Sequence, residues 1–461
     1  MDNFIFHNPT RLIFGKGMIA QLSQQIPADK RIMITFGGGS VKTNGVYEQV
    51  IQALEGRDYT EFWGIESNPD ISTLKKAIES GKEKNIDFLL AVGGGSVIDG
   101  TKLISAGIPY DGDAWELVKK GSAQNTIPLG TVLTIPATGS EMNNGAVISC
   151  RETHEKYPFF SSHPVFSILD PTVTFSLPDY QIACGLADTF VHVMEQYMTK
   201  TNESYLMDRW SESILRTLVQ IAPQIKENKQ DYHLMSEFMM SATMALIAMG
   251  LSEDWATHMI GHELTALHGM THGQTLAIVF PGTLRTLADK KRDKILQYGE
   301  RIWGVTSGVP SVRVSLTIEK TEEFFRNLGL KTRLDEAGIG DDTIEEIVRR
   351  FNERGAAYGE DGDVTGEVES RILQNCKSKK ETTDTEGTSM KTVILTSFKS
   401  DVRAHMLQDL LKNEGIESML QGEYTAQVLA YIPGMEIKVL VFEKDYVRAF
   451  EILKASFPEK V

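Results

Sequence analysis

The sequence predicts an α/β domain with a parallel sheet, then an all-α helical domain, and a small α+β module at the C-terminus. Three observations carry this prediction. In the first third of the chain, short β-rich runs that stop at glycine or proline alternate with helical patterns. From about Leu177 to residue 375, helical patterns follow one another with few strand-like runs. A polar stretch at 377–390 then precedes a last segment, 391–461, in which strand and helix patterns return.

The α/β prediction rests on three runs that are rich in β-forming residues: Arg31–Phe36, Asp87–Val92 and Thr131–Ile135. The first two end at a Gly-Gly-Gly-Ser run, the third ends at Pro136, and Ser72–Lys84 has a helical pattern. Strand, turn, helix and strand in this order are typical of a parallel sheet. Ligands of such sheets bind at the carboxyl ends of the strands, so both glycine runs are candidate binding loops.

The rest of the chain is divided by composition. The helical part is rich in methionine, which we interpret as filling of buried helices. The stretch 377–390 is polar and rich in threonine, so we expect a flexible linker there. Beyond it, strand patterns at Thr392–Thr396, Gly415–Leu420 and Glu436–Phe442 combine with helical patterns at Ser400–Asn413 and Tyr446–Phe457. The expected parts are therefore an α/β domain (1–176), a helical domain (177–376), a linker (377–390) and an α+β module (391–461).

Composition narrows the class of protein. The 461 residues are too many for one ordinary domain, and 41% hydrophobic and 24% charged residues are usual for a soluble globular protein. A formal net charge of −15 argues against a nucleic-acid partner or an anionic membrane surface. Three widely spaced cysteines predict no disulfide framework, which favours a cytoplasmic location. Met1–Phe14 lacks the pattern of a signal peptide, and no stretch approaches the roughly 18 apolar residues of a membrane span.

Histidines cluster in one window of the helical part. Four of the ten histidines of the chain lie within Thr257–Gln274, namely His258, His262, His268 and His272. His258 and His262 are four positions apart and therefore share one helix face. The cluster indicates a metal site, although a solvated helix face rich in histidine has the same pattern.

A second pair of residues favours the metal site. Asp188 and His192 are also four positions apart on a predicted helix. A carboxylate oxygen together with imidazole nitrogens suits a divalent transition metal such as Fe²⁺ or Zn²⁺. An Asp–His pair alone is common on protein surfaces, so the prediction depends on both windows together.

The run Gly93–Lys102 (GGGSVIDGTK) follows a predicted strand and opens a predicted helix. Glycines at such a turn allow backbone N–H groups to approach a phosphate, and the start of the helix favours negative charge. The spacing is not GxGxxG, so that general fingerprint does not apply. A tight strand-to-helix turn without a ligand is the alternative.

The earlier glycine run, Gly37–Ser40, bears on the choice of cofactor. Sites that prefer NAD usually place an acidic residue at this point to hold the ribose 2′-hydroxyl. The sequence has Ser40 and then Lys42 there, either of which could bind a 2′-phosphate. The run therefore favours NADP(H) over NAD(H).

Long segments of the chain resemble the iron-containing (group III) alcohol dehydrogenases, over roughly residues 1–376. Within that family, the likeness is to the branch of NADPH-dependent butanol dehydrogenases and broad-range aldehyde reductases. The resemblance implies an N-terminal dinucleotide-binding domain and a helical metal-binding domain. The matching segments are GGGSVIDGTK at 93–102, TIPATGSEMNNGAVIS at 134–149, LDPTVTFSLPDYQIACGLADTFVHVMEQY at 169–197 and THMIGHELTALHGMTHGQTLAIV at 257–279.

The resemblance also implies roles for single residues. The four metal ligands are Asp188, His192, His258 and His272. His262 matches a nearby histidine implicated in catalysis, and His268 falls where a residue beside the nicotinamide lies. The implied cofactor contacts are Gly37, Gly38, Ser40, Asn68, Gly94, Gly95, Ser96, Asp99, Thr134, Thr138, Asn143 and Lys156.

The implied activity is that of an NADP(H)-linked alcohol dehydrogenase that acts mainly as an aldehyde reductase on short-chain aldehydes and primary alcohols. One divalent ion, Fe²⁺ or Zn²⁺ with Ni²⁺ or Mn²⁺ as further candidates, would polarise the carbonyl oxygen. His262 would then relay a proton or orient a ligand. Relatives are often dimers, so a homodimer is expected.

Other functions stay open at this stage. A glycerol dehydrogenase-like polyol oxidoreductase, or a dehydroquinate synthase, would have the same architecture. Residues 391–461 resemble a family of bacterial signal-transducing domains with ferredoxin-like βαββαβ character and no established function. A cofactor- or metal-sensing protein that signals through this module is therefore a further alternative.

Overall fold

The structure is a computed structural model that describes residues 3–199, 204–247, 252–378, 392–421, 437–442 and 445–460. These residues form two compact units. The first extends to Lys294 and includes Thr321–Ser378, and the second combines Ile295–Lys320 with the described residues from 392 onward. The predicted linker lies outside the described residues except for Lys377 and Ser378. These two residues contact Asp341 and Asp335.

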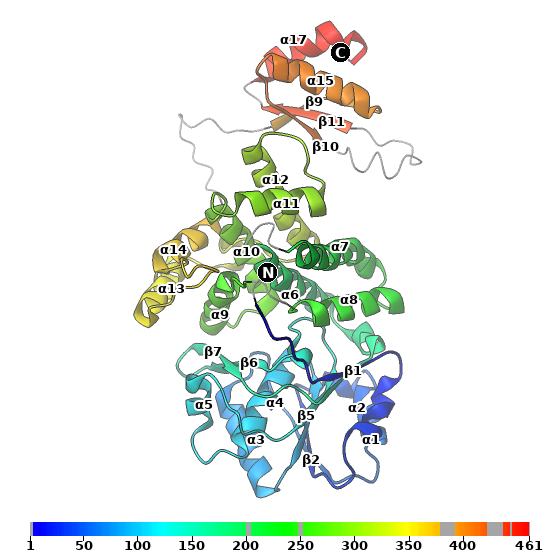
Figure 1. The fold of residues 1–461 in the computed structure, drawn as a ribbon, viewed down its shortest axis with the longest axis vertical. Helices are drawn as coiled ribbons and strands as arrows, with labels where there is room; N and C mark the ends of the chain where they lie inside the picture. The colour runs from blue at the N-terminus through cyan, green and yellow to red at the C-terminus, as the bar shows by residue number, and fades with distance from the viewer. Residues whose placement is uncertain are drawn as a thin grey trace. The chain divides into compact units, whose positions relative to one another are not determined.

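A parallel sheet forms one layer of the first unit (Figure 1). Its strand order is β1-β8-β5-β4-β2-β3. All neighbouring strands of this sheet run parallel. Four of them are buried along their whole length, as expected for a sheet that is covered on both faces. The strands are β1 (Arg11–Phe14), β2 (Ile32–Phe36), β3 (Tyr59–Phe62), β4 (Phe88–Gly93), β5 (Leu129–Leu133) and β8 (Phe166–Leu169).

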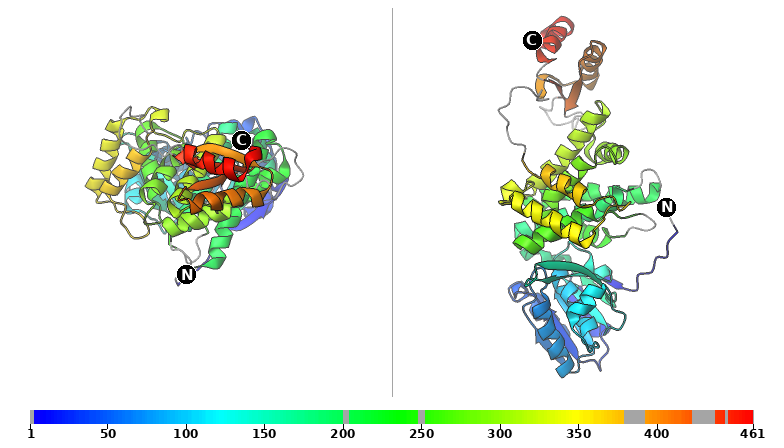
Figure 2. Two further views of the ribbon diagram at one scale, coloured as in Figure 1. Left: turned by 90° about the horizontal axis from the view of Figure 1, so that it is seen from above. Right: turned by 90° about the vertical axis from the view of Figure 1, so that its left-hand side faces the viewer.

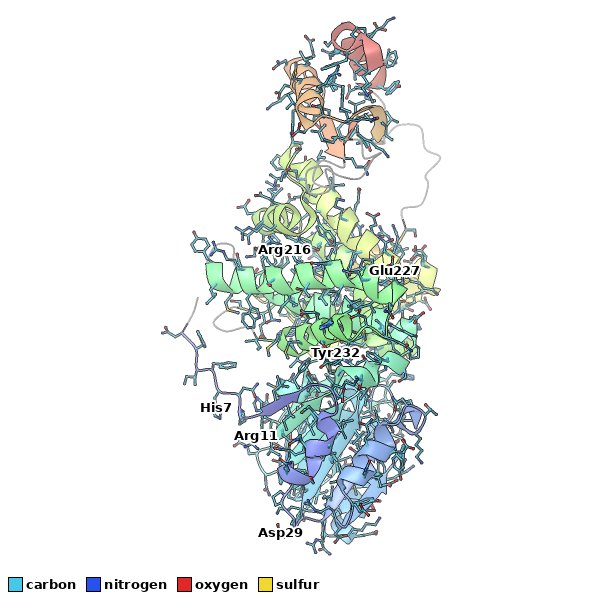
Figure 3. All side chains as sticks on the ribbon, turned by 90° about the vertical axis from the view of Figure 1, so that its right-hand side faces the viewer. His7, Arg11, Asp29, Arg216, Glu227 and Tyr232 are labelled. Carbon is cyan, nitrogen blue, oxygen red and sulfur yellow. The ribbon has the colours of Figure 1, made fainter. Side chains whose placement is uncertain are left out.

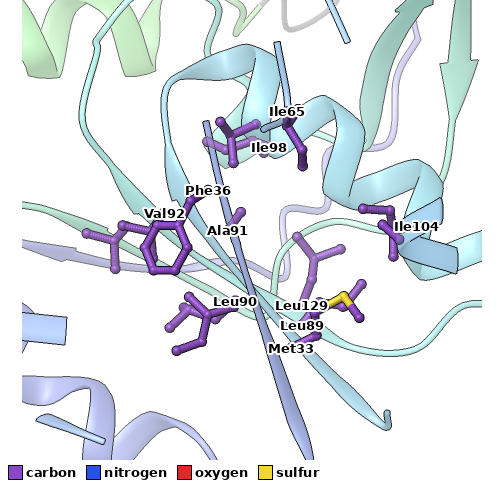
Figure 4. Packing of buried hydrophobic residues seen from close by; sticks show 14 of the residues in the cluster. Met33, Phe36, Ile65, Leu89, Leu90, Ala91, Val92, Ile98, Ile104 and Leu129 are labelled. Carbon is purple, nitrogen blue, oxygen red and sulfur yellow. The ribbon is translucent and has the colours of Figure 1, made fainter. Parts of the chain in front are cut away.

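Helices cover this sheet. Helix α4 (Gly95–Gly107) contacts β2, β4 and β5, and it packs on α3 (Ile71–Glu83). Figure 4 shows Ile98 and Ile104 of α4 with the buried residues of β2 and β4 that form this core. The remaining short elements are η1 (Met18–Gln21), α1 (Leu22–Gln25), η2 (Ser40–Lys42), α2 (Val46–Ala53), α5 (Ala114–Lys120), η3 (Ser140–Met142) and η4 (Pro171–Ser176).

An antiparallel hairpin, β6 (Gly145–Cys150) and β7 (Glu155–Phe160), is a feature that the sequence did not predict. Strand β6 contacts α4, while β7 contacts α5 and α9. At its turn, Nη1 of Arg350 donates to the carbonyl oxygen of His154 over 2.6 Å. The hairpin therefore connects the α/β layer to the helical layer of the same unit.

The second layer of the first unit is helical (Figures 1 and 2). Figure 3 labels Arg216 and Glu227 on α7, and Tyr232 where α8 begins. Residues 248–251, which follow α8, lie outside the described residues. The helices of this layer are α6 (Asp179–Tyr197), α7 (Tyr205–Glu227), α8 (Tyr232–Met244), α9 (Ala256–His268), α10 (His272–Thr286), α13 (Asp341–Arg354) and α14 (Gly366–Asn375), with η5 (Asp335–Ala337). Most of α11 (Arg292–Trp303) and of α12 (Pro310–Asn327) belongs to the second unit.

Helices α6 and α10 approach each other without a side chain between them. A Cβ atom on Gly273 would meet the carbonyl oxygen of Cys184. Gly273 follows His272 at the start of α10, and Cys184 lies one turn before Asp188 on α6. This backbone contact therefore fixes the distance between two of the predicted metal ligands.

The C-terminal module contains β9 (Thr392–Phe398), α15 (Asp401–Asn413), β10 (Ser418–Gln421), β11 (Ile437–Phe442), α17 (Tyr446–Ser456) and η7 (Pro458–Lys460). Its antiparallel sheet has the order β10-β11-β9. Apolar residues of both helices and the sheet form a separate core. The predicted α+β class is confirmed, but the described residues after α17 contain no fourth strand of a βαββαβ fold.

None of the helices in the described part of the chain combines the length and apolar character that crossing a bilayer requires.

Candidate metal and cofactor site

One carboxylate oxygen is the centre of the candidate metal site. Oδ1 of Asp188 lies 3.4 Å from Nδ1 of His192. It also lies 3.7 Å from Nε2 of His258 and 3.6 Å from Nε2 of His272. The first two residues lie on α6, His258 on α9 and His272 at the start of α10, so three helices bring the four side chains together.

These distances fit a bound divalent ion. Ligand atoms at about 2.1 Å from an ion in tetrahedral coordination lie about 3.4 Å from each other. The buried atoms Oδ1 of Asp188, Nδ1 of His192 and Nε2 of His258 have no hydrogen-bond partner among the described residues. One atom from each of Asp188, His258 and His272 lies within 4.8 Å of the others, and His192 is outside that group. Three of the predicted ligands therefore form a compact set, with His192 beside Asp188.

The pKa shifts of Asp188, His192 and His272 also suit a metal. Burial alone would raise the pKa of the Asp188 carboxyl, but His192 and His272 hold it well below its usual range. Burial lowers the pKa of His192 to about 4 and that of His272 well below its usual value. For His258, the carboxylates of Glu195 and Asp188 outweigh burial and raise the pKa to about 9. The lowered pKa values of His192 and His272 favour the neutral imidazole, which is the form that coordinates an ion.

The local sequence explains why these residues meet. Helix α6 is buried along most of its length, and Asp188 and His192 share one of its faces because they are four positions apart. Gly269, with φ +66°, ends α9, and the chain returns at once into α10. His258 and His272 consequently come from two consecutive helices, α9 and α10, which pack on each other, and α10 also packs on α6.

Glu195 is a site residue that the sequence reading missed. Its Oε2 atom forms a short contact with Nδ1 of His258, and its Oε1 accepts from the backbone N–H of Thr257 over 2.6 Å. Glu195 lies seven positions after Asp188, so the same helix face carries both residues. That spacing was the available signal, but a lone glutamate on a helix indicates nothing until its partner is known.

The two predicted catalytic histidines have different surroundings. His262 is buried, its ring centroid lies 5.1 Å from that of His272, and its Nδ1 has no partner among the described residues. Burial and the charge of Lys156 hold its pKa well below the usual value. His268 is exposed, and its Nε2 lies 3.0 Å from Oγ1 of Thr343 on α13. The structure therefore places His262, but not His268, against the imidazole cluster.

The glycine turn after β4 has the features of a phosphate site. Strand β4 ends at Gly93 and α4 begins at Gly95, so Gly94 alone separates them. The first turn of α4 has no side-chain cap, which leaves backbone N–H groups for a ligand. A Cβ on Gly95 would meet the side chain of Thr138, and one on Gly94 would meet Ile135 at 3.0 Å. A side chain at position 95 would therefore clash with Thr138, and one at position 94 would press on Ile135.

Several predicted cofactor residues surround this turn. Asn68, with φ +57°, accepts from Nζ of Lys156 over 3.1 Å, and its backbone N–H donates to Oγ of Ser96 over 3.3 Å. Burial lowers the pKa of Lys156 to about 8. Near them, the backbone N–H of Thr134 donates to the carbonyl oxygen of Gly93 over 3.0 Å. These contacts connect the turn to β5 and to the β6–β7 hairpin.

Asp99 and Asn143 have structural partners. Asp99 accepts from Oγ of Ser140 over 2.6 Å and from the backbone N–H of Val147 over 2.9 Å. Asn143 accepts from Nζ of the fully buried Lys102 over 3.0 Å. Asp99 and Asn143, both predicted to contact the cofactor, therefore also hold the loop after β5 against α4.

The end of β2 has no carboxylate within the run Gly37–Ser40. Ser40 and Lys42 form the short helix η2, and Nζ of Lys42 lies 4.0 Å from the centroid of the Trp63 ring. The ring of Phe36 stacks on that of Trp63 at 4.0 Å. The aromatic contact holds the ammonium group of Lys42 at the carboxyl end of the sheet.

Comparison with known proteins agrees with this geometry. Residues 9–171 match the family model of iron-containing alcohol dehydrogenases, and residues 182–359 match the C-terminal model of the same family. The chain is 47% identical to the NADPH-dependent aldehyde reductase YqhD of Escherichia coli over 384 residues, which are 81% of this chain and 99% of that protein.

The chain belongs to the iron-containing alcohol dehydrogenase family.

Solved structures of this family have the same fold. A crystal structure of Escherichia coli YqhD, 46% identical, covers 82% of this chain and 99% of its own, with a TM-score of 0.79. A structure of NADH-dependent butanol dehydrogenase A from Thermotoga maritima is 34% identical and has a TM-score of 0.78. The match covers 82% of this chain and 99% of that one. The NADH-dependent butanol dehydrogenase A of Clostridium acetobutylicum is 38% identical over 361 residues, 76% of this chain and 93% of that protein.

This iron-containing alcohol dehydrogenase has an additional C-terminal segment. Residues 390–456 match a different family model, described as "Putative prokaryotic signal transducing protein". The match to YqhD takes in nearly all of that relative but only 81% of this chain. The module is therefore an addition to a complete family fold.

Proposed function

We propose that the chain is a metal-dependent, NADP(H)-linked alcohol dehydrogenase that works mainly as an aldehyde reductase on short-chain aldehydes and primary alcohols. The observation that carries this proposal is the arrangement around Asp188, whose Oδ1 atom has three imidazole nitrogens at 3.4–3.7 Å. The relatives described above are an aldehyde reductase and butanol dehydrogenases, which supports this substrate class.

Each group of the site has a proposed role. Asp188, His192, His258 and His272 hold one divalent ion, Fe²⁺ or Zn²⁺ first and Ni²⁺ or Mn²⁺ as alternatives. When bound, the ion supplies Lewis acidity to a carbonyl oxygen and the reduced nicotinamide supplies hydride. The first turn of α4 binds the pyrophosphate through its backbone N–H groups.

His262 is the proposed proton relay. It is a neutral imidazole beside His272, so one ring nitrogen carries a proton and the other accepts one. This allows it to pass a proton to the product oxygen without a stable charge. His268 stays a weaker candidate beside the nicotinamide, because its described contact is with Thr343.

The preference for NADP(H) is a separate part of the proposal. Gly37, Gly38 and Ser40 leave the end of β2 without a negative charge, and Lys42 supplies a positive one. A 2′-phosphate is stabilised by such a lysine, whereas an acidic residue would repel it. The other cofactor contacts that we propose are Asn68, Gly94, Gly95, Ser96, Asp99, Thr134, Thr138, Asn143 and Lys156.

We also propose the larger organisation expected from the sequence, with domains 1–176 and 177–376, a linker at 377–390 and a module at 391–461.

Three buried free cysteines support a cytoplasmic location, since such thiols persist in a reducing compartment. A homodimer is supported by the edge strand β1 and the exposed apolar side chains of Phe4, Ile5 and Phe6 before it. Light scattering after gel filtration tests it.

The decisive experiment is an assay of turnover. Protein purified without a chelator is analysed for metal and then mixed with NADPH and butanal, while absorbance of the reduced nicotinamide is followed. We expect one ion per chain and steady oxidation of NADPH. A protein that turns over glycerol with NAD⁺ but not butanal would favour the polyol alternative. Tight NADP binding without turnover would favour a sensor.

A further inference from the structure

One carboxylate connects α6 to the start of α9. Glu195 is 2% exposed and lies on α6, one turn after His192. Its Oε1 accepts from the backbone N–H of Thr257 over 2.6 Å, and its Oε2 contacts Nδ1 of His258. Both oxygens are therefore engaged by two consecutive residues of α9.

At the start of α9, Oδ1 of Asp254 accepts from the N–H of Ala256 over 3.2 Å, but the N-cap residue itself adds no cap. Trp255 is the N-cap residue, has φ +59° and makes no side-chain capping bond. The N–H of Thr257 is one of the donors that a helix start leaves without an internal partner. Glu195 supplies the missing acceptor, and its backbone oxygen also accepts from the N–H of Asp254 over 3.0 Å. The first turn of α9 is consequently held by α6.

The chemistry of the contact decides which nitrogen of His258 is free. An ionised carboxylate only accepts hydrogen bonds, so Nδ1 of His258 must carry a proton. Binding of an ion displaces the other proton of His258 and so uses the lone pair on Nε2, the atom that lies 3.7 Å from Oδ1 of Asp188. Imidazole ligands in metal sites typically donate their second N–H to a carboxylate in this way.

We infer that Glu195 is a positioning residue that selects the metal-binding tautomer of His258 and thereby sets the affinity of the site for a divalent ion. This inference rests on the proposed function, because it requires that Asp188 and the imidazoles bind an ion. In this role Glu195 acts through His258 and is not itself a proposed ligand.

The test is a titration of the metal-free full-length protein with Zn²⁺ in competition with a chromophoric chelator. In Glu195→Gln, the amide can turn its NH₂ group toward Nδ1, which moves the proton of His258 to Nε2 and blocks coordination. We expect about a 10- to 100-fold lower affinity for Zn²⁺ in this variant. Affinity within twofold of the wild type would overturn the inference.

A matched control separates metal positioning from stabilisation of a helix. Asp231 caps α8, where its Oδ1 accepts from the N–H groups of His233 and Leu234 over 2.8 and 3.1 Å. Asp231→Asn therefore removes a charge from a helix start that has no metal ligand. We expect this control to bind Zn²⁺ like the wild type. An equal loss of affinity in Asp231→Asn and Glu195→Gln would mean that Glu195 only stabilises the fold, which contradicts the inference.

Circular dichroism of each metal-free variant checks folding. If Glu195→Gln does not fold, Glu195→Asp replaces it, since the shorter side chain keeps the charge but does not reach the imidazole. The same loss of affinity is expected, and binding like the wild type would again overturn the inference. A wild-type chain that binds no Zn²⁺ would instead refute the proposed function and this inference with it.

Discussion

Gly273 lies so close to Cys184 that a single carbon added to Gly273 would meet the Cys184 carbonyl oxygen. The neighbour of Gly273 is His272, whose Nε2 lies 3.6 Å from Oδ1 of Asp188. The spacing of α6 and α10 is thus set by backbone contact, and the metal site depends on that spacing.

Gly273→Ala is expected to push α10 away from α6 and to separate His272 from Asp188. We expect a loss of stability of about 1–3 kcal/mol, typical of an overpacked core, and at least tenfold weaker Zn²⁺ binding. Gly269→Ala is the control, because its φ of +66° makes alanine strained while nothing lies within 4 Å of the added carbon. It should lower the melting temperature but leave Zn²⁺ binding unchanged. Equal Zn²⁺ affinity in both variants would contradict the role of the contact.

His272→Ala is expected to remove a metal ligand without unfolding the chain, since His272 lies at the first position of α10 with an 18% exposed side chain. Metal analysis should find less than one ion per chain, and the rate of NADPH oxidation should fall to background. His233→Ala, at an exposed histidine of α8, serves as the control and should retain both metal and activity. Normal turnover by metal-free His272→Ala would refute the mechanism.

Lys42→Ala tests the preference for NADP(H). Loss of a positive charge that binds the 2′-phosphate is expected to lower kcat/KM about tenfold for NADPH, and less than twofold for NADH. Steady-state kinetics with both nucleotides measure the difference. Lys16→Ala, at an exposed lysine of the same layer, should change neither value. An equal loss with NADPH and NADH would assign Lys42 to packing on Trp63 rather than to cofactor choice.

Glu369 predicts a pH dependence of stability. Burial, with the nearby charge of Glu263, raises the pKa of the Glu369 carboxyl from 4.5 to about 10, and neither oxygen has a hydrogen-bond partner among the described residues. The folded state therefore keeps this group protonated. Its contribution to stability is complete below pH 4.5 and is lost as the pH rises from 4.5 toward 10.

Glu369→Gln should accordingly raise the free energy of unfolding at pH 8 by about 1–3 kcal/mol and weaken its decline with pH. Denaturant titrations at pH 6, 7, 8 and 9 measure this. Glu367→Gln, at an exposed position of the same helix, should leave the curve of the wild type unchanged. If Glu369→Gln is less stable than the wild type at pH 8, the conclusion that the Glu369 carboxyl is neutral in the folded state is contradicted.

A chain that ends at Ser378 tests the sensor alternative. All proposed metal and cofactor residues precede that point, and the match to YqhD covers 99% of that relative without the C-terminal module. We expect kcat/KM for butanal within twofold of the full chain. Loss of turnover in a folded, metal-loaded truncated protein would show that the module is needed for activity.

Buried strands could be predicted from the sequence, whereas the β6–β7 hairpin could not. Strands β2 and β4 match their predicted ranges within one residue, because strands buried on both faces are continuous apolar runs that end at glycine. The β6–β7 hairpin was missed, since β7 contains Pro158 and charged residues and has no apolar run.

The candidate metal site could be predicted because Asp188 and His192 are four positions apart on one helix, and because His258 and His272 lie in one window that is rich in histidine. Their convergence on Asp188 Oδ1 follows from contacts between helices, which no local pattern contains. Glu195 and the pairing of His268 with Thr343 were out of reach for the same reason: each depends on a partner that is distant in sequence.

The contacts of Glu195 have a consequence for recombination between relatives. Residues 254, 257 and 258 are all bonded to this one position of α6. A chimera with its crossover between α6 and α9 would pair a carboxylate from one parent with a helix start from another. Crossovers placed before α6 or after α10 keep the whole candidate metal site within the sequence of a single parent. These are therefore the junctions at which segments can be exchanged without separating Glu195 from its partners.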